Sequence, residues 1–477
     1  MTAELWERDA WELADEVRAG ELSAVQLLDV SLERIERLDP ALNAICHLDP
    51  DAARADAATV DERVAAGEDP GLFAGIPMGV KELAAVEGWP DTHASVPLRE
   101  RIAVVDTAEV ARLREAGAVI TAQTTSPEHG TVSFTSTPLH GVTRNPWNPS
   151  RTPGGSSGGS AACVAAGLFP ACTGSDGGGS IRIPSAYSGL FGMKTTFGLL
   201  ATGPGPVDYP SMTSVHGPIV RSVRDAARYL DTNTGPSLTD FTSLPKPPVP
   251  FEELLTTGEA VESLRGKRAA WSSTLGYAAT DPEVEKLAYE AAMKLVEEAE
   301  LELVDVPVEL PKPGLAWGIL SSLGTAAWYL EDVREHFDDL TEVHRGGMEM
   351  MANLRGNGVF KAIRRRHELL TATASVFSQV DVLLTPTTPT VAFEAEGRLV
   401  GEVAGQSVNL MGLSAAFTAP FNMTCQPAAS IPAGLVDGMP MALQVVARRH
   451  EDELCLAAGA LMEAARPWPK LAPFASE

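Results

Sequence analysis

The sequence contains few cysteines, and none of them lies in a pattern typical of disulfide frameworks or metal sites. Its 477 residues include only five, at Cys46, Cys163, Cys172, Cys425 and Cys455. They are scattered, odd in number and without CxxC spacing, and the nine histidines form no pair at metal-ligand spacing. These absences argue against a disulfide framework and against a bound metal, and they favour a reducing, cytoplasmic location.

The sequence also lacks long hydrophobic runs and an excess of basic residues. No stretch approaches the roughly 18 apolar residues that a membrane span requires. The N-terminal segment is charged and has no apolar h-region, so we expect no signal peptide. The 63 acidic residues outnumber the 37 basic ones, giving a net charge of −26. Such a charge favours solubility and argues against nucleic acid or an anionic membrane as a partner.

Helix and strand patterns alternate along the chain, which predicts an α/β protein. Residues 76–80 form a short apolar run typical of a strand, and residues 106–117 resemble a capped helix followed by a strand over 118–122. Near the N-terminus, Ser23 and Gln26 have the spacing of a helix capping box.

The most informative stretch runs from Arg151 to Pro184, with the sequence RTPGGSSGGSAACVAAGLFPACTGSDGGGSIRIP. Two turns rich in glycine and serine, Gly154–Ser160 and Gly177–Ser180, bracket an apolar segment. A Gly/Ser tract is often a flexible linker, but the flanks predict a buried helix over 161–166 and a buried strand over 168–173.

A serine preceded by three glycines ends the second turn, as Gly177-Gly178-Gly179-Ser180. Glycine allows unusual backbone conformations and close approach to a ligand. Backbone N–H groups in such a turn are free to converge on one point, which suits an oxyanion. From the residues alone, the chain is therefore a soluble α/β protein with a candidate oxyanion site.

The motifs of this stretch, together with others outside it, resemble the amidase signature family. They are residues 154–162 (GGSSGGSAA), 174–184 (GSDGGGSIRIP), 75–82 (GIPMGVKE), 421–424 (FNMT) and 438–448. Several long motifs in one order make the resemblance specific, and it extends over most of the chain.

The resemblance implies a single large domain, residues 1–477, with a mixed, twisted β-sheet flanked by helices on both faces. Within it, residues 1–66 are expected to form N-terminal helices, residues 75–200 the signature core, and residues 240–372 a helical region that caps the active site. Homodimers are common in the family, so a homodimer is a candidate assembly.

The family also implies a Ser–cis-Ser–Lys triad, with Ser180 as nucleophile, Ser156 as bridging serine and Lys81 as base. A serine hydroxyl needs a nearby base, and serine–lysine pairs are a known variant of the triad. The lysine must be neutral, so burial must lower its pKa from about 10.4. A hydroxyl donates and accepts at once, which allows Ser156 to relay the proton. The resemblance further implies a cis peptide bond before Ser156 and requires no metal or organic cofactor.

The remaining site residues are also assigned by resemblance. The backbone N–H groups of Gly177, Gly178, Gly179 and Ser180 would form the oxyanion hole, and two supporting residues, Asp176 and Arg182, would brace the nucleophile loop. The sequence departs from the common family pattern at Gly177, where threonine or isoleucine is more frequent. It also departs at Glu82, Thr125 and Thr195, where aspartate, asparagine and proline are usual.

The expected activity is hydrolysis of a small-molecule amide to an acid and an amine or ammonia through a Ser180 acyl-enzyme. Aryl or acyl amides, nylon-type oligomers and carbamates are the substrate classes considered. One alternative is the glutaminase subunit of a tRNA-dependent amidotransferase, although those subunits usually carry glutamine at the position of Ile183. Another is a non-catalytic scaffold, but Lys81, Ser156 and Ser180 are all present.

Overall fold

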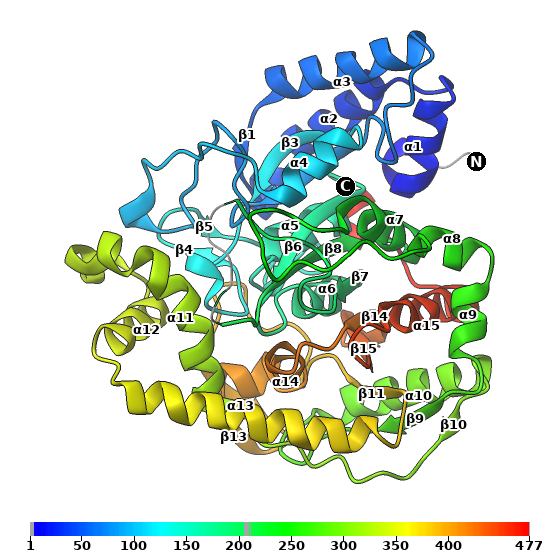
Figure 1. The fold of residues 1–477 in the computed structure, drawn as a ribbon. Coiled ribbons are helices and arrows are strands. Elements are labelled where there is room, and N and C mark those ends of the chain that lie inside the picture. The colour runs from blue at the N-terminus through cyan, green and yellow to red at the C-terminus, as the bar shows by residue number, and fades with distance from the viewer. Residues whose placement is uncertain (1–3, 205–208, 210, 477) are drawn as a thin grey trace.

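An eleven-stranded sheet runs through the molecule (Figure 1). The computed structural model describes residues 4–204, 209 and 211–476. In chain order the strands of this sheet are β1 (Ile45–Leu48), β2 (Pro77–Lys81), β3 (Val119–Thr124), β6 (Ala171–Asp176), β7 (Phe191–Lys194), β8 (Val215–Val220), β9 (Arg268–Trp271), β10 (Glu302–Leu303), β11 (Val382–Pro386), β14 (Ala428–Val436) and β15 (Met439–Ala447). Two hairpins, β4 (Ser136–Thr137) with β5 (Gly141–Val142) and β12 (Val400–Val403) with β13 (Gln406–Asn409), form separate two-stranded sheets.

The order of strands in the sheet is β1-β3-β2-β6-β8-β7-β14-β15-β11-β9-β10. Strands β3, β2 and β6 are parallel to one another, as are β11, β9 and β10, whereas the central pairs are antiparallel. The sheet is therefore mixed, as predicted. Because β2 and β6 are parallel neighbours, their C-terminal ends lie at the same edge.

The helices are α1 (Ala10–Arg18), α2 (Ala24–Leu42), α3 (Pro50–Ala65), α4 (Ala108–Glu115), α5 (Gly158–Ala165), α6 (Arg182–Ser188), α7 (Val223–Asn233), α8 (Phe251–Thr256), α9 (Glu259–Leu264), α10 (Pro282–Glu298), α11 (Gly314–Val333), α12 (Glu342–Ala352), α13 (Gly356–Phe377), α14 (Ala419–Met423) and α15 (Asp452–Ala465). The Ser23 hydroxyl caps α2 and Gln26 completes the capping box, which confirms the prediction for this helix start.

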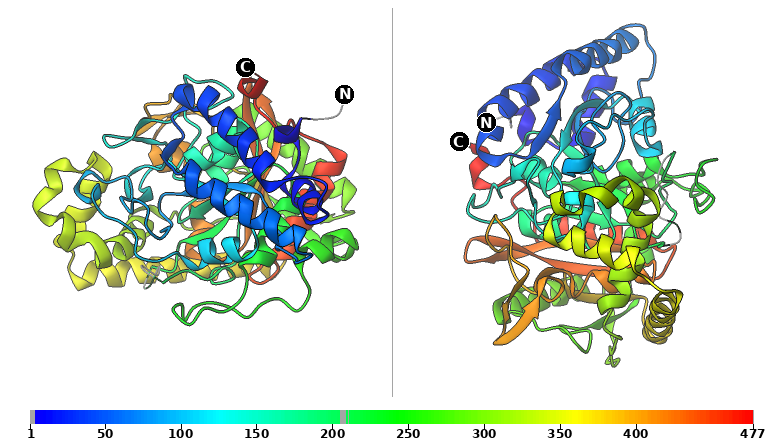
Figure 2. Two further views of the ribbon diagram at one scale, coloured as in Figure 1. Left: turned by 90° about the horizontal axis from the view of Figure 1, so that it is seen from above. Right: turned by 90° about the vertical axis from the view of Figure 1, so that its left-hand side faces the viewer.

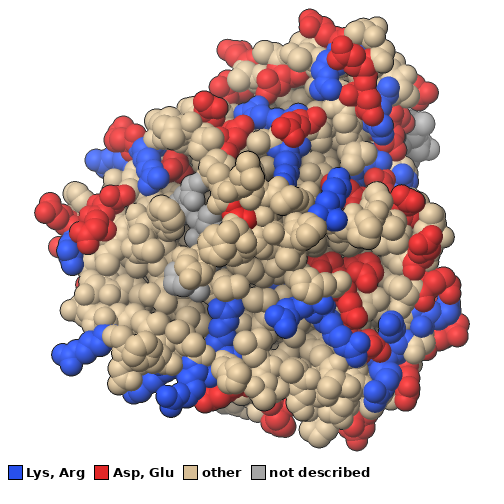
Figure 3. Space-filling view, viewed as in Figure 1, with Lys and Arg blue, Asp and Glu red and all other residues tan. Residues whose placement is uncertain are grey.

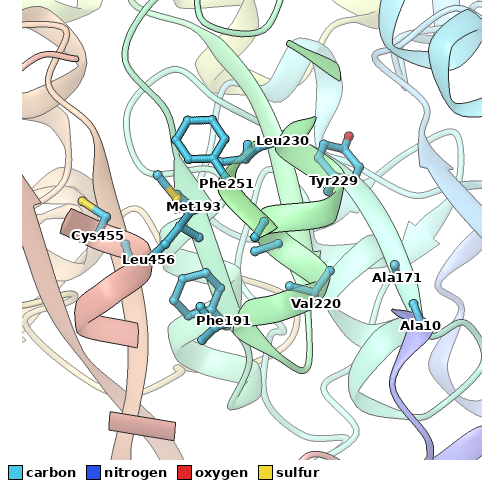
Figure 4. Packing of buried hydrophobic residues seen from close by; sticks show 14 of the residues in the cluster. Ala10, Ala171, Phe191, Met193, Val220, Tyr229, Leu230, Phe251, Cys455 and Leu456 are labelled. Carbon is cyan, nitrogen blue, oxygen red and sulfur yellow. The ribbon is translucent and has the colours of Figure 1, made fainter. Parts of the chain in front are cut away.

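Both faces of the sheet are covered, as the alternation of side chains along its strands demonstrates. Ala171 and Val445 belong to the first hydrophobic cluster. Their neighbours in the chain, Cys172 and Val446, belong to two other clusters on the opposite face. The first cluster contains residues of α1, α4, α7, α10 and α15; Figure 4 shows part of it, including Phe191 of β7. The predicted layout, with helices on both faces, is confirmed.

Two predicted regions differ in detail from the structure. Residues 1–66 are not wholly helical, because β1 pairs antiparallel with β3 at the sheet edge. This strand has four half-buried residues, too few to reveal a period of two in the sequence. Residues 240–372 also divide: β9 and β10 join the sheet, and only α11, α12 and α13 pack on one another as a separate helical layer (Figures 1 and 2).

The surface carries both signs of charge. Acidic and basic side chains are interspersed on the face shown in Figure 3. Within the described part of the chain, no helix is both long and apolar enough to span a membrane.

Candidate active site

The site lies where β2 and β6 end side by side. Lys81 is the last residue of β2, and its backbone N–H donates to Thr173 Oγ1 of β6 at 3.0 Å. The turn before α5 carries Ser156, and the loop between β6 and α6 carries Ser180. The parallel pairing of two strands thus brings Lys81 to both glycine-rich turns.

The Lys81 side chain ends between two serine hydroxyls. Its Nζ lies 2.7 Å from Ser156 Oγ and 2.9 Å from Ser175 Oγ, and the residue is only 1% exposed. The Gly155–Ser156 peptide bond is cis, as the resemblance implied. Ser175 was not among the predicted site residues, although it stands directly before Asp176 in the motif.

Burial lowers the pKa of Lys81 to about 7, against the opposing effect of the charges of Asp176, Glu82 and Glu109. A neutral amine has one lone pair and two N–H donors. Lys81 is thus able to accept a proton from Ser156 while donating to Ser175. A base whose pKa lies close to neutrality is well matched to proton transfer at physiological pH.

Ser180 is partly exposed and faces the larger of two cavities near the site. The N–H of Ser157 donates to the carbonyl of Ser180 at 3.2 Å, which ties the two glycine-rich turns together. Among the described residues the Ser180 hydroxyl has no hydrogen-bond partner. Hydrogen bonds to nucleophiles are often long without substrate and tighten when it binds.

The nucleophile loop, here residues 176–180 with the predicted nucleophile Ser180 at its end, is held through its backbone carbonyl groups. Each of five successive carbonyls accepts a hydrogen bond: Asp176 O from Asn422 Nδ2 at 2.7 Å, Gly177 O from Trp317 Nε1 at 2.9 Å, Gly178 O from Thr418 Oγ1 at 2.6 Å, Gly179 O from Ile183 N at 2.7 Å and Ser180 O from Ser157 N at 3.2 Å. In a trans peptide the N–H points opposite to the carbonyl. These acceptors therefore fix the direction of each N–H in the loop.

The N–H groups of this loop do not all remain available. The N–H of Gly179 donates to Asp176 Oδ1 at 2.7 Å, so this donor is already used, contrary to the expectation that it faces an oxyanion. The N–H groups of Gly177, Gly178 and Ser180 have no hydrogen-bond partner within the described part of the chain. The sequence could not reveal this division, because it depends on where the Asp176 carboxylate turns.

Asp176 and Arg182 form a fully buried ion pair beneath the loop. Two guanidinium nitrogens each lie 2.9 Å from a carboxylate oxygen, and both side chains are 0% exposed. Burial alone would raise the pKa of Asp176, but the Arg182 charge holds it well below its usual range. Arg182 also donates to Gln444 and Asn422, at 2.8 and 2.7 Å. The predicted supporting pair thus joins the loop to β15 and α14.

The cavity at Ser180 has a volume of about 510 Å³ and lies between the nucleophile loop, α11 and the 409–415 segment. None of its described lining residues is ionisable. Its apolar lining is formed by Val132, Ile183, Leu315, Trp317, Val343, Leu399, Leu410, Met411 and Ala415. It suits an uncharged, largely apolar ligand.

A smaller cavity, of about 210 Å³, lies on the Lys81 side of the relay and is more polar. Its wall includes Ser175 and the pair formed by half-buried His216 and buried Glu109, whose Nδ1 and Oε2 atoms are 2.8 Å apart. His216 is the partner of Ser175 across strands β6 and β8. No motif marks this pair, since its members are far apart along the chain.

Three potential metal ligands converge next to Lys81. Cys46 Sγ, a carboxylate oxygen of Glu82 and a ring nitrogen of His140 all lie within 4.8 Å of one another. Each is already hydrogen-bonded: Glu82 Oε2 to His140 Nε2 at 2.9 Å, and Cys46 to the Gln123 carbonyl at 3.5 Å. Each of the three side chains therefore already has a hydrogen-bond partner within the protein.

Comparison with known proteins places this arrangement in a family. Residues 26–456 match the family model described as Amidase. An acylamidase from Rhodococcus erythropolis is 34% identical over 471 residues, which cover 97% of this chain and 96% of that protein. One subunit of the glutamyl-tRNA(Gln) amidotransferase from Roseiflexus castenholzii is also 34% identical, covering 96% of each protein.

The fold also agrees with that of a solved structure. A bacterial aryl acylamidase described as an amidase signature enzyme superimposes with a TM-score of 0.90 at 29% identity, over 97% of each chain. The chain belongs to the amidase family. It is accordingly a hydrolase that acts on carbon–nitrogen amide bonds.

Proposed function

We propose that this protein hydrolyses small, uncharged amides that carry an apolar group, through an acyl-enzyme on Ser180. The observation that carries this proposal is the composition of the cavity at Ser180, whose described lining is apolar or neutral. The Lys81–Ser156 hydrogen bond, at 2.7 Å, supports the proposed proton relay from Ser180 to Lys81. Aryl and acyl amides fit this cavity better than charged substrates do.

The proposed reaction follows from the arrangement of the relay. Ser180 attacks the amide carbonyl while its proton passes to Ser156, which gives its own proton to Lys81. The oxyanion accepts hydrogen bonds from the free N–H groups of the loop, at Gly177, Gly178 and Ser180. The relay returns the proton to the leaving amine. Water, deprotonated by the same relay, then releases the acid.

A glutaminase function fits this cavity less well. Free glutamine carries a carboxylate and an ammonium group, and burying either without an opposite charge is costly. Ile183, at the position where amidotransferase subunits usually carry glutamine, lies in the cavity wall. The similarity to an amidotransferase nevertheless makes glutamine the necessary comparison substrate.

The test combines active-site labelling with a substrate panel. A fluorophosphonate should label Ser180 in the wild type, and labelling should slow strongly in the Lys81→Ala and Ser156→Ala variants. Lys294→Ala, on the exposed face of α10, is the matched control and should label normally. Aryl acylamides should be hydrolysed much faster than glutamine. Preferential release of ammonia from glutamine would overturn the substrate proposal, and absence of label on Ser180 would overturn the mechanism.

A further inference from the structure

We propose that Trp317, on the helical layer, is a positioning residue that sets the direction of the Gly178 N–H in the oxyanion hole. This inference rests on the proposed function. Trp317 lies in the first turn of α11, and its indole N–H donates to the Gly177 carbonyl at 2.9 Å. That carbonyl and the Gly178 N–H belong to the same peptide group.

The geometry of a trans peptide connects these two groups. With the Gly177 carbonyl held by the indole, the Gly178 N–H must point to the opposite side of the peptide. This N–H is one of the three loop donors without a partner among the described residues. Trp317 thus acts on an oxyanion donor without donating to the oxyanion itself.

The contact between Trp317 and the loop depends on the absence of a side chain at Gly178. A Cβ on Gly178 would lie 2.5 Å from Cζ2 of the indole, far inside van der Waals contact. The ring therefore lies directly on the backbone of the loop. It also forms part of the cavity wall at Ser180, so a bound substrate would press against it.

Trp317 is the one member of the helical layer among the groups that hold the five carbonyls. The other four donors are Asn422, Thr418, Ile183 and Ser157, none of which belongs to α11, α12 or α13. The hydrogen bond to the Gly177 carbonyl is therefore the one of the five that is made directly by α11. The proposed oxyanion hole is therefore complete only when α11 packs against the loop and Trp317 holds the Gly177 carbonyl.

Glycine at position 177 makes this peptide dependent on an outside contact. Glycine restricts its own φ and ψ less than any other residue. Space does not require it here, because a Cβ on Gly177 would meet only Ser214 atoms at 3.8 Å and its φ lies outside the left-handed region. A β-branched residue at 177 should fit and stiffen the loop by itself.

The first experiment compares Trp317→Phe with Trp468→Phe. The first variant keeps an aromatic ring but loses the indole donor; the second loses an equivalent indole–carbonyl bond, to Arg221 at 3.3 Å, remote from the site. Complete loss of an oxyanion donor costs about 10²–10³ in kcat. We expect Trp317→Phe to lower kcat by about 10-fold or more, because the donor is misdirected but not removed. The KM should change much less, and Trp468→Phe should retain wild-type kcat.

A rescue experiment separates positioning from simple packing. Gly177→Thr should restore a large part of kcat in the Trp317→Phe background, measured against Trp317→Phe alone. Gly178→Ala, which forces the indole off the loop, should lower kcat even with Trp317 present. An unchanged kcat in Trp317→Phe, a loss seen only in KM, or no rescue by Gly177→Thr would each overturn the inference. A wild type that neither labels at Ser180 nor hydrolyses amides would instead overturn the proposed function.

Discussion

Lys81 Nζ lies 2.7 Å from Ser156 Oγ and 2.9 Å from Ser175 Oγ, so the buried amine has a hydroxyl on each side. In the proposed mechanism, the lone pair of neutral Lys81 faces Ser156 and one of its N–H groups donates to Ser175. In that mechanism Ser175 orients the base, and Ser156 connects the base to Ser180. The parallel neighbours β2 and β6 supply two of these three residues, and the turn before α5 supplies the third.

The first prediction concerns the pH dependence of kcat/KM. In the proposed mechanism Lys81 acts only when it is unprotonated, so activity should be lost as the pH falls through the pKa of Lys81, about 7. The Glu109 charge raises that pKa, so Glu109→Gln should move the acid limb to lower pH. The measurement is kcat/KM between pH 5 and 9 for both proteins. An acid limb that moves to higher pH in the variant would contradict the assignment.

The second prediction concerns the bridging serine. Ser156→Ala removes the hydroxyl through which the proposed mechanism passes the proton to Lys81, and general-base transfer typically contributes about 10²–10⁴ to the rate. We expect kcat to fall by about that factor with little change in thermal stability. Ser185→Ala is the matched control, because Ser185 is also a buried serine and its hydroxyl has no hydrogen-bond partner among the described residues. Equal losses in the two variants would show that Ser156 is merely structural.

The parts of the candidate site that are local in the chain were located by their resemblance to the family motifs, whereas the residues alone did not distinguish Lys81 from a surface lysine. Ser156 and Ser180 lie in glycine-rich turns, and Lys81 follows a recognisable apolar strand. Trp317 was not predictable, since it lies 140 residues from Gly177 along the chain and resembles an ordinary core aromatic on a helix. The choice of Gly179 as the donor to Asp176 depends on side-chain orientation, which no motif encodes. Strand β1 was not predicted, because its four half-buried residues show no alternation of buried and exposed side chains.

The third prediction concerns the buried pair of Asp176 and Arg182. Removing one partner of a buried ion pair leaves an uncompensated charge and typically costs about 3–5 kcal/mol. Arg182→Met should lower the free energy of unfolding by about that amount and abolish labelling of Ser180. Arg365→Ala breaks an exposed pair with Glu368 and should cost less than about 1 kcal/mol. Urea unfolding followed by circular dichroism compares the two variants, and equal costs would contradict the special role of the buried pair.

The fourth prediction concerns acid stability and the helical layer. His344 of α12 stacks on His129 of the core with ring centroids 4.4 Å apart, and His129 stacks in turn on His93 at 5.3 Å. His344 is 1% exposed, and burial, with a smaller contribution from the nearby His93, lowers its pKa to about 4. Its ring nitrogens have no hydrogen-bond partner among the described residues. A proton on this ring would therefore be poorly stabilised in the folded state.

The sign of the effect follows from proton binding. Between about pH 6.5 and pH 4 the unfolded chain protonates His344 while the folded protein does not, so acid favours unfolding. The free energy of unfolding should fall by about 1.4 kcal/mol per pH unit from this group alone. His344→Phe keeps an apolar ring and should reduce that slope, whereas His336→Gln, at an exposed position, should leave it unchanged. Urea unfolding at pH 7, 6 and 5 measures the slope, and equal slopes in the His344→Phe variant and the wild type would rule out His344 as the acid-sensitive group.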